Sequence, residues 1–353
     1  MANITTLHWN IETYGPGKWA NGNNAHMINY IATLVNIVNA DIICLVEIGN
    51  AIAGVFPGTL ATDINALQGI LAANNPWRSV HINSGFNNEC SLIMYRTDRN
   101  FLPYHLVNGT GANVVPEHGA CMDNLAGNRV QFPSRMTAQG GRRPFYASFE
   151  TTDTNNIFSV ITYHAMFGAQ TAYGVIRLPS LHIISEFDDG PPPTAIPSCL
   201  ISGDFNVDYV ANFVDYANML ALPSVNATNE DTSLRNNPGP SNNPLTFRDH
   251  AYDNVFQVSA VAANPGVVTD LMVESAVVPP WPPPPPAPPP PPAAQPHVGT
   301  LSAAAGAFIV ANIGMARIAN AVAVVPPVDM NTAWDFVREA ISNHYPVSVT
   351  TTI

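Results

Sequence analysis

The stretch LISGDFN at residues 200–206 decides the fold class and marks a candidate site. Its apolar run stops at Gly203 and is followed by Asp204 and Asn206, a carboxylate and a carboxamide two residues apart. Because side chains alternate along a strand, a buried strand here places both polar groups on one side of its carboxyl end, where open sheets hold their sites. Alone, the pattern also fits a plain strand exit whose side chains bond to backbone. Its meaning therefore depends on the rest of the chain.

Other segments rich in β-branched and aromatic residues recur along the chain and predict further strands. With the strand at 199–202, they cover residues 4–9, 42–46, 91–95, 145–149, 158–163, 254–258 and 347–351. Between the first two strands, residues 25–38 carry apolar side chains at helical spacing. The alternation predicts a mixed α/β domain. No uncharged run of about 20 apolar residues predicts a membrane span.

The charge balance limits the ligands that the surface attracts. The chain of 353 residues is 46% hydrophobic, enough for a large core, and its 13 basic against 25 acidic residues give a net charge of -12. Lys18 is its only lysine. Such a surface repels nucleic acid and anionic membranes unless metal ions or a local arginine cluster reverse the field. We therefore expect any phosphate-containing substrate to be bound at one local site, through a metal ion.

The cysteines and the amino terminus give weaker signals. Cys44, Cys90, Cys121 and Cys199 lack the close-pair spacing of a zinc site, and three of them lie in or beside predicted strands. This favours buried free thiols, with one disulfide left open. The chain enters its first predicted strand without a basic leader or an apolar signal region, which leaves the compartment open.

The composition changes abruptly at residue 279. Residues 279–292 contain only Trp281 and Ala287 besides proline, and as polyproline II they would extend roughly 43 Å, at about 3.1 Å per residue. The following residues 300–325 are Ala-rich and predict a helix, either packed on its own domain or binding a partner or membrane. A second helix is predicted at 334–341.

Polar side chains stand at the ends of the predicted strands. They are Asn10, Glu47, Glu89, His164, Asp204, Asn206, Asp253, Asn343 and His344. Carboxylates, amides and imidazoles together form a set suited to holding a hard cation and cleaving a phosphate ester. Each residue alone also fits a structural role. Their joint occurrence at separate strand ends favours a catalytic site.

Four motifs in a fixed order carry a family resemblance. Trp-Asn-Ile at 9–11, Val-Glu-Ile at 46–48, Ser-Gly-Asp-Phe-Asn at 202–206 and Ser-Asn-His-Tyr-Pro-Val at 342–347 resemble the endonuclease/exonuclease/phosphatase superfamily. Within it the chain is most similar to secreted pancreatic-type deoxyribonucleases and related bacterial toxins. The resemblance runs from about residue 4 to residue 349 and leaves 261–325 as an insertion in a single domain, 1–353. It implies an α/β (α+β) fold, a four-layer αββα sandwich of two packed mixed β-sheets with the site along their upper edges.

The resemblance also implies a role for each polar residue at a strand end. Glu47 resembles the principal metal ligand, with Asn10 beside it in the network around the metal and phosphate. Asp204 matches the carboxylate that orients or deprotonates the attacking water, and Asn206 matches a donor to a phosphate oxygen. The histidines that face the scissile phosphate correspond to His164 and His344, held by Glu89 and Asp253.

Two further features qualify this assignment. Arg142 and Arg143 precede a predicted strand and resemble the position where nucleases place an arginine on the DNA backbone; a solvated loop pair is the alternative. Asn343 stands where the family has Asp, so an amide there coordinates through its oxygen without neutralising a cation. Four more histidines, His8, His105, His118 and His250, have no expected partner and are taken as structural or surface residues.

The leading hypothesis is a DNA phosphodiesterase that depends on a divalent cation, with Mg²⁺ expected first and Ca²⁺ or Mn²⁺ as alternatives. A second hypothesis keeps the chemistry and changes the substrate to a sphingomyelin-like or phosphoinositide lipid. A third, motivated by Asn343, is a catalytically weakened module that binds a protein partner or itself through residues 261–325. Membrane contact is the less favoured partner, and the resemblance favours a secreted protein.

The insertion gives the first testable prediction. Deleting residues 279–325 and closing the gap with a short flexible linker should leave cooperative unfolding intact, because a proline run cannot donate the hydrogen bonds of a sheet. Chemical denaturation followed by circular dichroism measures this. The control replaces only 279–292 with Gly-Ser repeats of equal length. A non-cooperative deletion variant beside a cooperative control would show that the 300–325 helix belongs to the core.

Overall fold

A computed structural model gives the fold and carries side chains. It describes residues 3–14, 28, 31–32, 35–36, 38–49, 58–73, 75–83, 89–103, 120–121, 144–165, 198–221, 224–226, 231–233, 249–259, 267–270, 342–344 and 346–353. The candidate phosphate contacts Arg142 and Arg143 lie outside these residues. So do the polyproline run and the predicted helices at 300–325 and 334–341.

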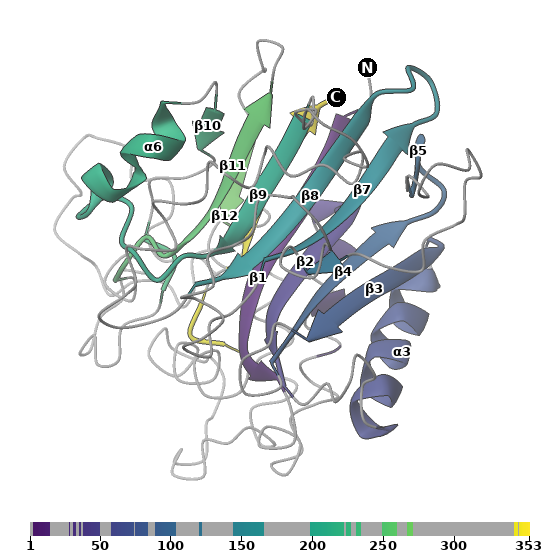
Figure 1. Ribbon diagram of the computed structural model, residues 1–353. Helices are drawn as coiled ribbons and strands as arrows, with labels where there is room; N and C mark the ends of the chain where they lie inside the picture. Colours follow the sequence, from purple (N-terminus) through teal and green to yellow (C-terminus); the bar gives the residue numbers. More distant parts are fainter. Residues whose placement is uncertain are drawn as a thin grey trace, which may run out of the picture.

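Two mixed sheets form the centre of the molecule (Figure 1). The six-stranded sheet has the order β12-β13-β1-β2-β4-β3, and the seven-stranded sheet has the order β10-β11-β9-β8-β7-β5 with β6 paired to β7. The first contains β1 (Asn3–Tyr14), β2 (Ile42–Ile48), β3 (Trp77–Asn83), β4 (Cys90–Arg96), β12 (Val267–Asp270) and β13 (Val347–Thr352). The second contains β5 (Phe101–Pro103), β6 (Ala120–Cys121), β7 (Phe145–Thr151), β8 (Ile157–His164), β9 (Ser198–Asp204), β10 (Ser224–Asn226) and β11 (Asp253–Ser259).

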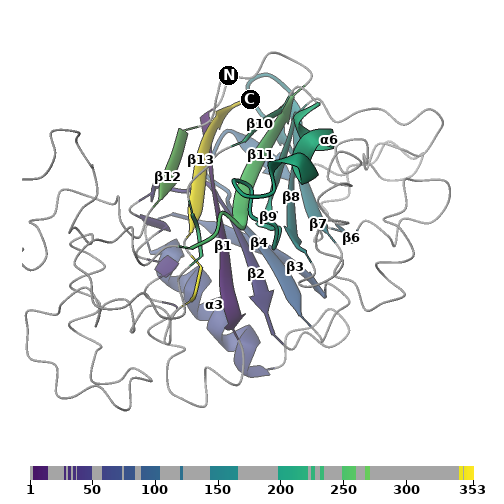
Figure 2. The same ribbon diagram turned by 90° about the vertical axis from the view of Figure 1, so that its left-hand side faces the viewer.

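Helices cover the outer faces of this pair of sheets (Figure 2). α3 (Gly58–Ala72) lies against β3, and the helical residues between β1 and β2 bury Ile31 and Val35. On the other side, η2 (Phe213–Tyr216) and α6 (Ala217–Leu220) place Tyr216 and Met219 in the apolar cluster of the second sheet. The predicted four-layer αββα sandwich is confirmed. Among the described helices, none is long and apolar enough to cross a membrane.

The eight predicted strands are all present. Most of their observed ends lie a few residues away from the predicted ends. Five further strands in the described part of the chain, β3, β5, β6, β10 and β12, were not predicted. Four of them have only two to four residues, too few for a periodic pattern to show. β3 has seven residues, but polar side chains interrupt its apolar ones. β12 belongs to the segment 261–325 that the sequence assigns to an insertion, and it pairs with β13 at the edge of the first sheet. The segment assigned to the insertion therefore contributes an edge strand to the first sheet.

The structure describes the side chains of three cysteines. Cys44, Cys90 and Cys199 are buried and form no disulfide, in agreement with the buried thiols that the sequence favours. Burial raises the pKa of Cys44 to about 12, against a smaller lowering by a side-chain hydrogen bond with Ser202 of β9. Thiols with such a raised pKa stay protonated and behave as small apolar side chains. Cys44 and Ser202 also show that β2 and β9 meet across the interface between the sheets.

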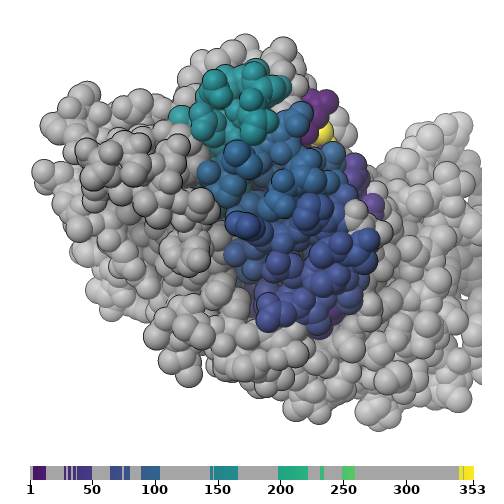
Figure 3. All heavy atoms as spheres, turned by 90° about the vertical axis from the view of Figure 1, so that its right-hand side faces the viewer, coloured from purple at the N-terminus to yellow at the C-terminus, as the bar shows by residue number. Residues whose placement is uncertain are grey.

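A buried arginine ties the outer layer to the first sheet. Arg96, the last residue of β4, donates from Nε and Nη2 to Asp98 at 2.9 and 2.7 Å. Its Nη1 donates to Asn39 at 3.0 Å, and Nη2 donates to Asn75 at 2.6 Å. These asparagines follow the two helices that pack on this sheet, so one guanidinium holds both helix exits. Figure 3 shows this side of the molecule, with α3 in the lower part of the coloured surface.

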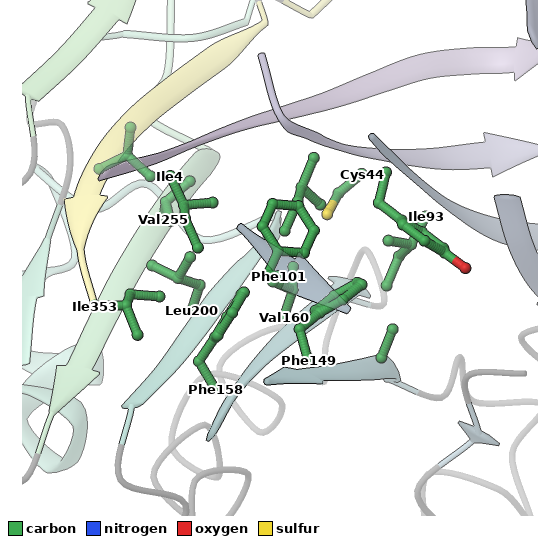
Figure 4. Close-up of a cluster of buried hydrophobic side chains, with 14 of the residues drawn as sticks. Ile4, Cys44, Ile93, Phe101, Phe149, Phe158, Val160, Leu200, Val255 and Ile353 are labelled. Carbon is green, nitrogen blue, oxygen red and sulfur yellow. The ribbon is translucent and has the colours of Figure 1, made fainter. Parts of the chain in front are cut away.

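The interface between the sheets changes character along its length. Its apolar part, shown in Figure 4, combines Ile4 of β1 with Phe158, Leu200 and Val255 of the second sheet. Further along β1, the inward-facing positions become Thr6, His8 and Asn10, all fully buried. The apolar end supplies the hydrophobic stabilisation of the sandwich, at about 25 cal/mol per Å² of apolar surface buried. The polar end is where the site forms.

The strand register brings the polar ends into one row. The parallel pairing of β8 and β9 places His164 opposite Asp204, and the antiparallel pairing of β9 and β11 places Asp204 opposite Asp253. The parallel strands β8 and β9 therefore end at the same edge of the sheet, and the antiparallel strand β11 starts at that edge. Three chemically active side chains from distant parts of the chain therefore lie side by side without any loop positioning them.

Gly203 sits where two backbones approach too closely for a side chain. It pairs with Tyr163 of β8, and a Cβ at this position would lie 2.1 Å from the Tyr163 carbonyl oxygen and 3.0 Å from a ring carbon of Phe205. The carbonyl belongs to the backbone of the paired strand. Relieving the clash therefore requires the strands to separate next to Asp204.

Gly203→Ala should destabilise the protein by about 3 kcal/mol, the cost of overpacking a rigid position. Urea denaturation of the purified protein measures the difference. Gly69→Ala in α3 is the matched control, because a Cβ there meets no atom within 4 Å. It should stabilise the helix by about 0.5–1 kcal/mol. Equal unfolding midpoints for Gly203→Ala and the parent would contradict the close approach.

Candidate active site

The site lies at one edge of the sandwich, where both sheets contribute strand ends. β1 and β2 provide Asn10 and Glu47, β8 and β9 provide His164 and Asp204, and β11 begins with Asp253. Residues 342–344 precede β13, which runs antiparallel to β1 and therefore starts at the same edge. The predicted residues that the structure describes are thus brought together from both sheets. Arg142 and Arg143 remain outside the described part of the chain.

His164 is held between carboxylates. Its Nδ1 lies 2.6 Å from Glu89 Oε1, and its Nε2 lies 3.2 Å from Glu47 Oε1 and 3.7 Å from Asp204 Oδ2. Burial favours the neutral ring, but the charges of Glu89, Glu47 and Asp204 outweigh it and raise the pKa of His164 above its ordinary value. The ring is therefore suited to donating a proton toward Asp204.

His344 forms a second pair of the same kind. Its Nδ1 lies 2.7 Å from Asp253 Oδ2, and its Nε2 lies 3.6 Å from Asp204 Oδ2. Burial lowers the pKa of His344, but the carboxylates of Asp253 and Asp204 raise it more, to about 10. Burial likewise opposes the charge of Asp253, and the His344 ring holds the pKa of that carboxyl down at about 2. Two carboxylate-held imidazoles thus converge on Asp204.

Asp204 is the meeting point of the site and is itself buried. Its Oδ2 accepts a hydrogen bond from Asn10 Nδ2 at 2.8 Å, and its Oδ1 accepts one from the Asn206 backbone N–H at 2.9 Å. Asn10 Nδ2 also donates to Glu47 Oε1 at 2.9 Å. One amide therefore fixes the relative position of two carboxylates. The Asn206 side chain donates to the Ala165 carbonyl at 2.9 Å, which leaves its second amide N–H for a ligand.

Backbone irregularities aim several of these side chains. Glu12, Glu47 and Asn206 have positive φ angles of 41°, 60° and 52°, a conformation that non-glycine residues rarely adopt. The ladders next to them are irregular too, with register shifts after Leu45 between β2 and β4 and after Asn10 between β1 and β2. Such breaks re-aim side chains and carry strain that the surrounding structure must hold. Here they turn the strand ends toward Asp204.

The segment carrying His344 is anchored on β1. Trp9 Nε1 donates to the His344 carbonyl oxygen at 2.7 Å, and Ser342 Oγ donates to the Asn10 carbonyl oxygen at 2.6 Å. The Asn343 backbone N–H donates to Glu12 Oε2 at 3.2 Å. The anchors place His344 over Asp253 although the two residues are far apart in sequence. Trp9 therefore supports the site as well as the core.

The donor set fits a divalent cation. Two groups, Glu47 with His164 and Asp204, and Asp204 with Asp253 and His344, each offer three ligand atoms within 4.8 Å of one another. Asn343 Oδ1 is a buried oxygen with no hydrogen-bond partner among the described residues. Carboxylate and amide oxygens are the ligands that hard cations such as Mg²⁺ prefer. Glu47 and Asp204 thus offer carboxylate oxygens to such a cation.

Two residues near the site had no role in the sequence interpretation. Glu12, two residues after Asn10, donates from its backbone N–H to Asn10 Oδ1 at 2.9 Å and accepts the Asn343 bond through its side chain. His8, two residues before Asn10, is fully buried with Nε2 3.5 Å from Asp253 Oδ1. The available signal was their spacing, because both alternate with Asn10 on the same strand.

Comparisons with known proteins establish the fold. The sequence matches no protein-family model, and a search of curated proteins finds no match. Among solved structures, it is similar to an endonuclease/exonuclease/phosphatase family protein of Bacteroides thetaiotaomicron (14% identity, TM-score 0.51, 99% of this chain and 98% of that chain). It is also similar to a mannosyl-6-phosphatase of that organism (15%, 0.51, 99% and 100%) and to truncated TDP2 of Caenorhabditis elegans (11%, 0.50, 99% and 98%).

The shared architecture extends over nearly the full length of this chain and of those proteins. The chain therefore has the endonuclease/exonuclease/phosphatase fold that its four motifs predict. Identities this low carry the fold alone, so the similarity to pancreatic-type deoxyribonucleases stays a prediction. Activity has to be argued from the site.

Asn343 offers a direct test of metal binding. Asn343→Asp should tighten Mg²⁺ binding about 10–100-fold, because a carboxylate adds negative charge where an unpartnered amide oxygen now lies. Isothermal titration with Mg²⁺ measures the change without a substrate. Asn155→Asp is the control, since it adds the same charge in the exposed turn at the opposite end of β8. Equal Mg²⁺ affinities for Asn343→Asp and the parent would place residue 343 outside the influence of the metal.

Proposed function

We propose that the chain is a phosphodiesterase that depends on a divalent cation and hydrolyses DNA. The observation that carries the proposal is the convergence of two imidazoles on one carboxylate oxygen. His164 and His344 each have Nδ1 on a carboxylate of their own and Nε2 within 3.7 Å of Asp204 Oδ2. A phosphoryl group in front of Asp204 would therefore meet two N–H donors and a carboxylate.

The side chains supply the steps of an in-line hydrolysis. Asp204 accepts a hydrogen bond from the attacking water and takes up its proton as the water oxygen bonds to phosphorus. His164 and His344 donate to the phosphoryl oxygens, and one of them gives its proton to the leaving oxygen as the phosphorus–oxygen bond breaks. A divalent cation, held by Glu47 with Asn10 and Asn343 beside it, would offset the negative charge on the phosphoryl oxygens.

DNA is proposed as the substrate because the four motifs resemble those of deoxyribonucleases. The net charge of -12 opposes a polyanion, so contact with DNA has to come from the cation and from Arg142 and Arg143. A phosphate monoester is also tested as a substrate, since one protein of similar fold is a mannosyl-6-phosphatase. Plasmid DNA, mannose 6-phosphate and lipid vesicles are therefore compared under the same conditions.

A lipid phosphodiester is the second candidate, and a specific surface favours it. Val210, Phe213 and Val214 are 57%, 53% and 78% exposed in the segment that follows Asn206. Exposed apolar side chains that are grouped in one segment favour contact with an apolar ligand or interface. The negative chain would tolerate a zwitterionic headgroup better than an anionic one. Hydrolysis of sphingomyelin vesicles without plasmid nicking would establish this alternative.

The prediction for catalysis is a loss of plasmid nicking in chelator and in three variants. Glu47→Gln should nearly abolish turnover, because it removes a unit of ligand charge. His164→Ala and His344→Ala should each reduce turnover by about 10²–10³-fold, as expected for a lost acid or oxyanion donor. Rates of nicking with Mg²⁺, Ca²⁺, Mn²⁺ and excess chelator measure these effects.

His250→Ala is the matched control. His250 also contacts a carboxylate, with Nδ1 3.0 Å from Asp208 Oδ2, but its ring is 42% exposed, and its ion pairs in the described part of the chain are with Asp208 and Asp249 instead of Asp204. Its turnover should stay within about threefold of the parent, as for a surface substitution. Full activity in excess chelator would contradict the metal-dependent mechanism. Absence of hydrolysis with every substrate would instead support the binding-module hypothesis.

A further inference from the structure

His8 is a buried histidine whose hydrogen bonds are incomplete. It lies on the face of β1 that points to the second sheet, and neither ring nitrogen has a hydrogen-bond partner among the described residues. Asp253 Oδ1, also fully buried, likewise lacks one. The two unpartnered atoms, His8 Nε2 and Asp253 Oδ1, face each other across the sheet interface at 3.5 Å.

Two orphaned polar atoms at this distance are better explained as a loose hydrogen bond than as independent defects. A buried donor or acceptor without a partner loses the hydrogen bonds that it made with water, and nearly all buried polar groups in proteins are paired. A shift of about 0.5 Å would bring the atoms to an ordinary N–H···O distance. Hydrogen bonds in sites without ligand are often long and tighten when the site is occupied.

We propose that His8 is a positioning residue for His344. Its Nε2–H donates to Asp253 Oδ1, so one carboxylate is held by an imidazole from each side and presents Oδ2 to His344 Nδ1. The assignment rests on the proposed hydrolytic function of the site and adds a residue that the sequence leaves among the structural histidines. His8 acts through Asp253 and does not touch the substrate.

The need for such a residue follows from how Asp253 is otherwise held. Its backbone N–H donates to Thr232 Oγ1 at 2.8 Å, which fixes the main chain but leaves the plane of the carboxylate free to turn. Among the described contacts, that plane is set only by His344 on Oδ2 and by His8 near Oδ1. Without His8, the carboxylate can rotate, and the His344 ring rotates with it. Nε2 then no longer points steadily at Asp204.

Three substitutions at position 8 separate this role from packing. His8→Phe keeps a ring and removes both nitrogens; His8→Gln places an amide N–H near the Nε2 position, and His8→Asn places one near the Nδ1 position. We expect kcat to fall about 10–100-fold in His8→Phe and His8→Asn, with KM within about twofold, and to stay within about threefold in His8→Gln. Thr6→Val is the control, because it changes another buried unpartnered group on the same face of β1. It should leave kcat unchanged.

A second readout is independent of turnover. Nitrogen-15 spectra of the full chain labelled at histidine identify which ring nitrogens carry protons. We expect the neutral His8 ring to be protonated at Nε2, and the Nδ1–H resonance of His344 to shift in His8→Phe but not in Thr6→Val. Should the parent hydrolyse no substrate, the proposed function fails, and these spectra alone decide whether His8 positions His344.

Several outcomes would overturn the proposal. One is a His8 ring protonated only at Nδ1, and another is an unchanged His344 resonance in His8→Phe. A third is equal kcat for His8→Gln and His8→Asn, which would show that the position of the N–H donor at residue 8 does not matter. This last comparison also covers the case in which His8→Phe does not fold, because both amide variants keep a polar side chain.

Discussion

Asp204 is the constraint on which the rest of the structure depends, because it is a buried carboxylate that needs partners from both sheets. A buried charge without partners costs several kcal/mol, so a fold that buries Asp204 must bring hydrogen-bond donors to it. Asn10 reaches it from the first sheet, while His164 and the Asn206 backbone reach it from the second. The packing of the two sheets and the formation of the site are thus one requirement. A sandwich packed in another register would leave the carboxylate unpaired.

The strands meet this requirement through a gradient along the sheet interface. In β1 the inward positions run from Ile4 through Thr6 to Asn10, and in β8 they run from Phe158 through Thr162 to His164. The apolar halves of the strands supply the burial that holds the sheets together, and the polar halves are carried to one edge by the same register. Stability and chemistry are therefore divided along each strand. The cost is a set of buried polar atoms, such as Thr6 Oγ1 and Thr162 Oγ1, that have no hydrogen-bond partner within the described part of the chain.

Much of this could be predicted from the sequence, and the exceptions share a cause. β8 was predictable because β-branched and aromatic residues fill its length, and β9 was predictable because a short apolar run stops at Gly203. Their polar ends predicted Asp204 and His164 as site residues, which the structure brings together. Glu47 could be predicted as a site residue from the sequence. Its positive φ angle could not, because a bulge depends on the partner strand. His8 was missed for the same reason: its environment is created by Asp253, 245 residues later in the chain.

The charge of the site explains why a cation suits it. Four carboxylates, those of Glu47, Glu89, Asp204 and Asp253, surround the imidazoles of His164 and His344. Even with both rings protonated, these groups leave two negative charges without a balance, in a place where burial makes uncompensated charge costly. One divalent cation would balance them. Asn343 fits this account, since an amide supplies an oxygen without adding a third unbalanced charge. An aspartate at position 343 would add that third charge, and a single divalent ion would then no longer balance the carboxylates.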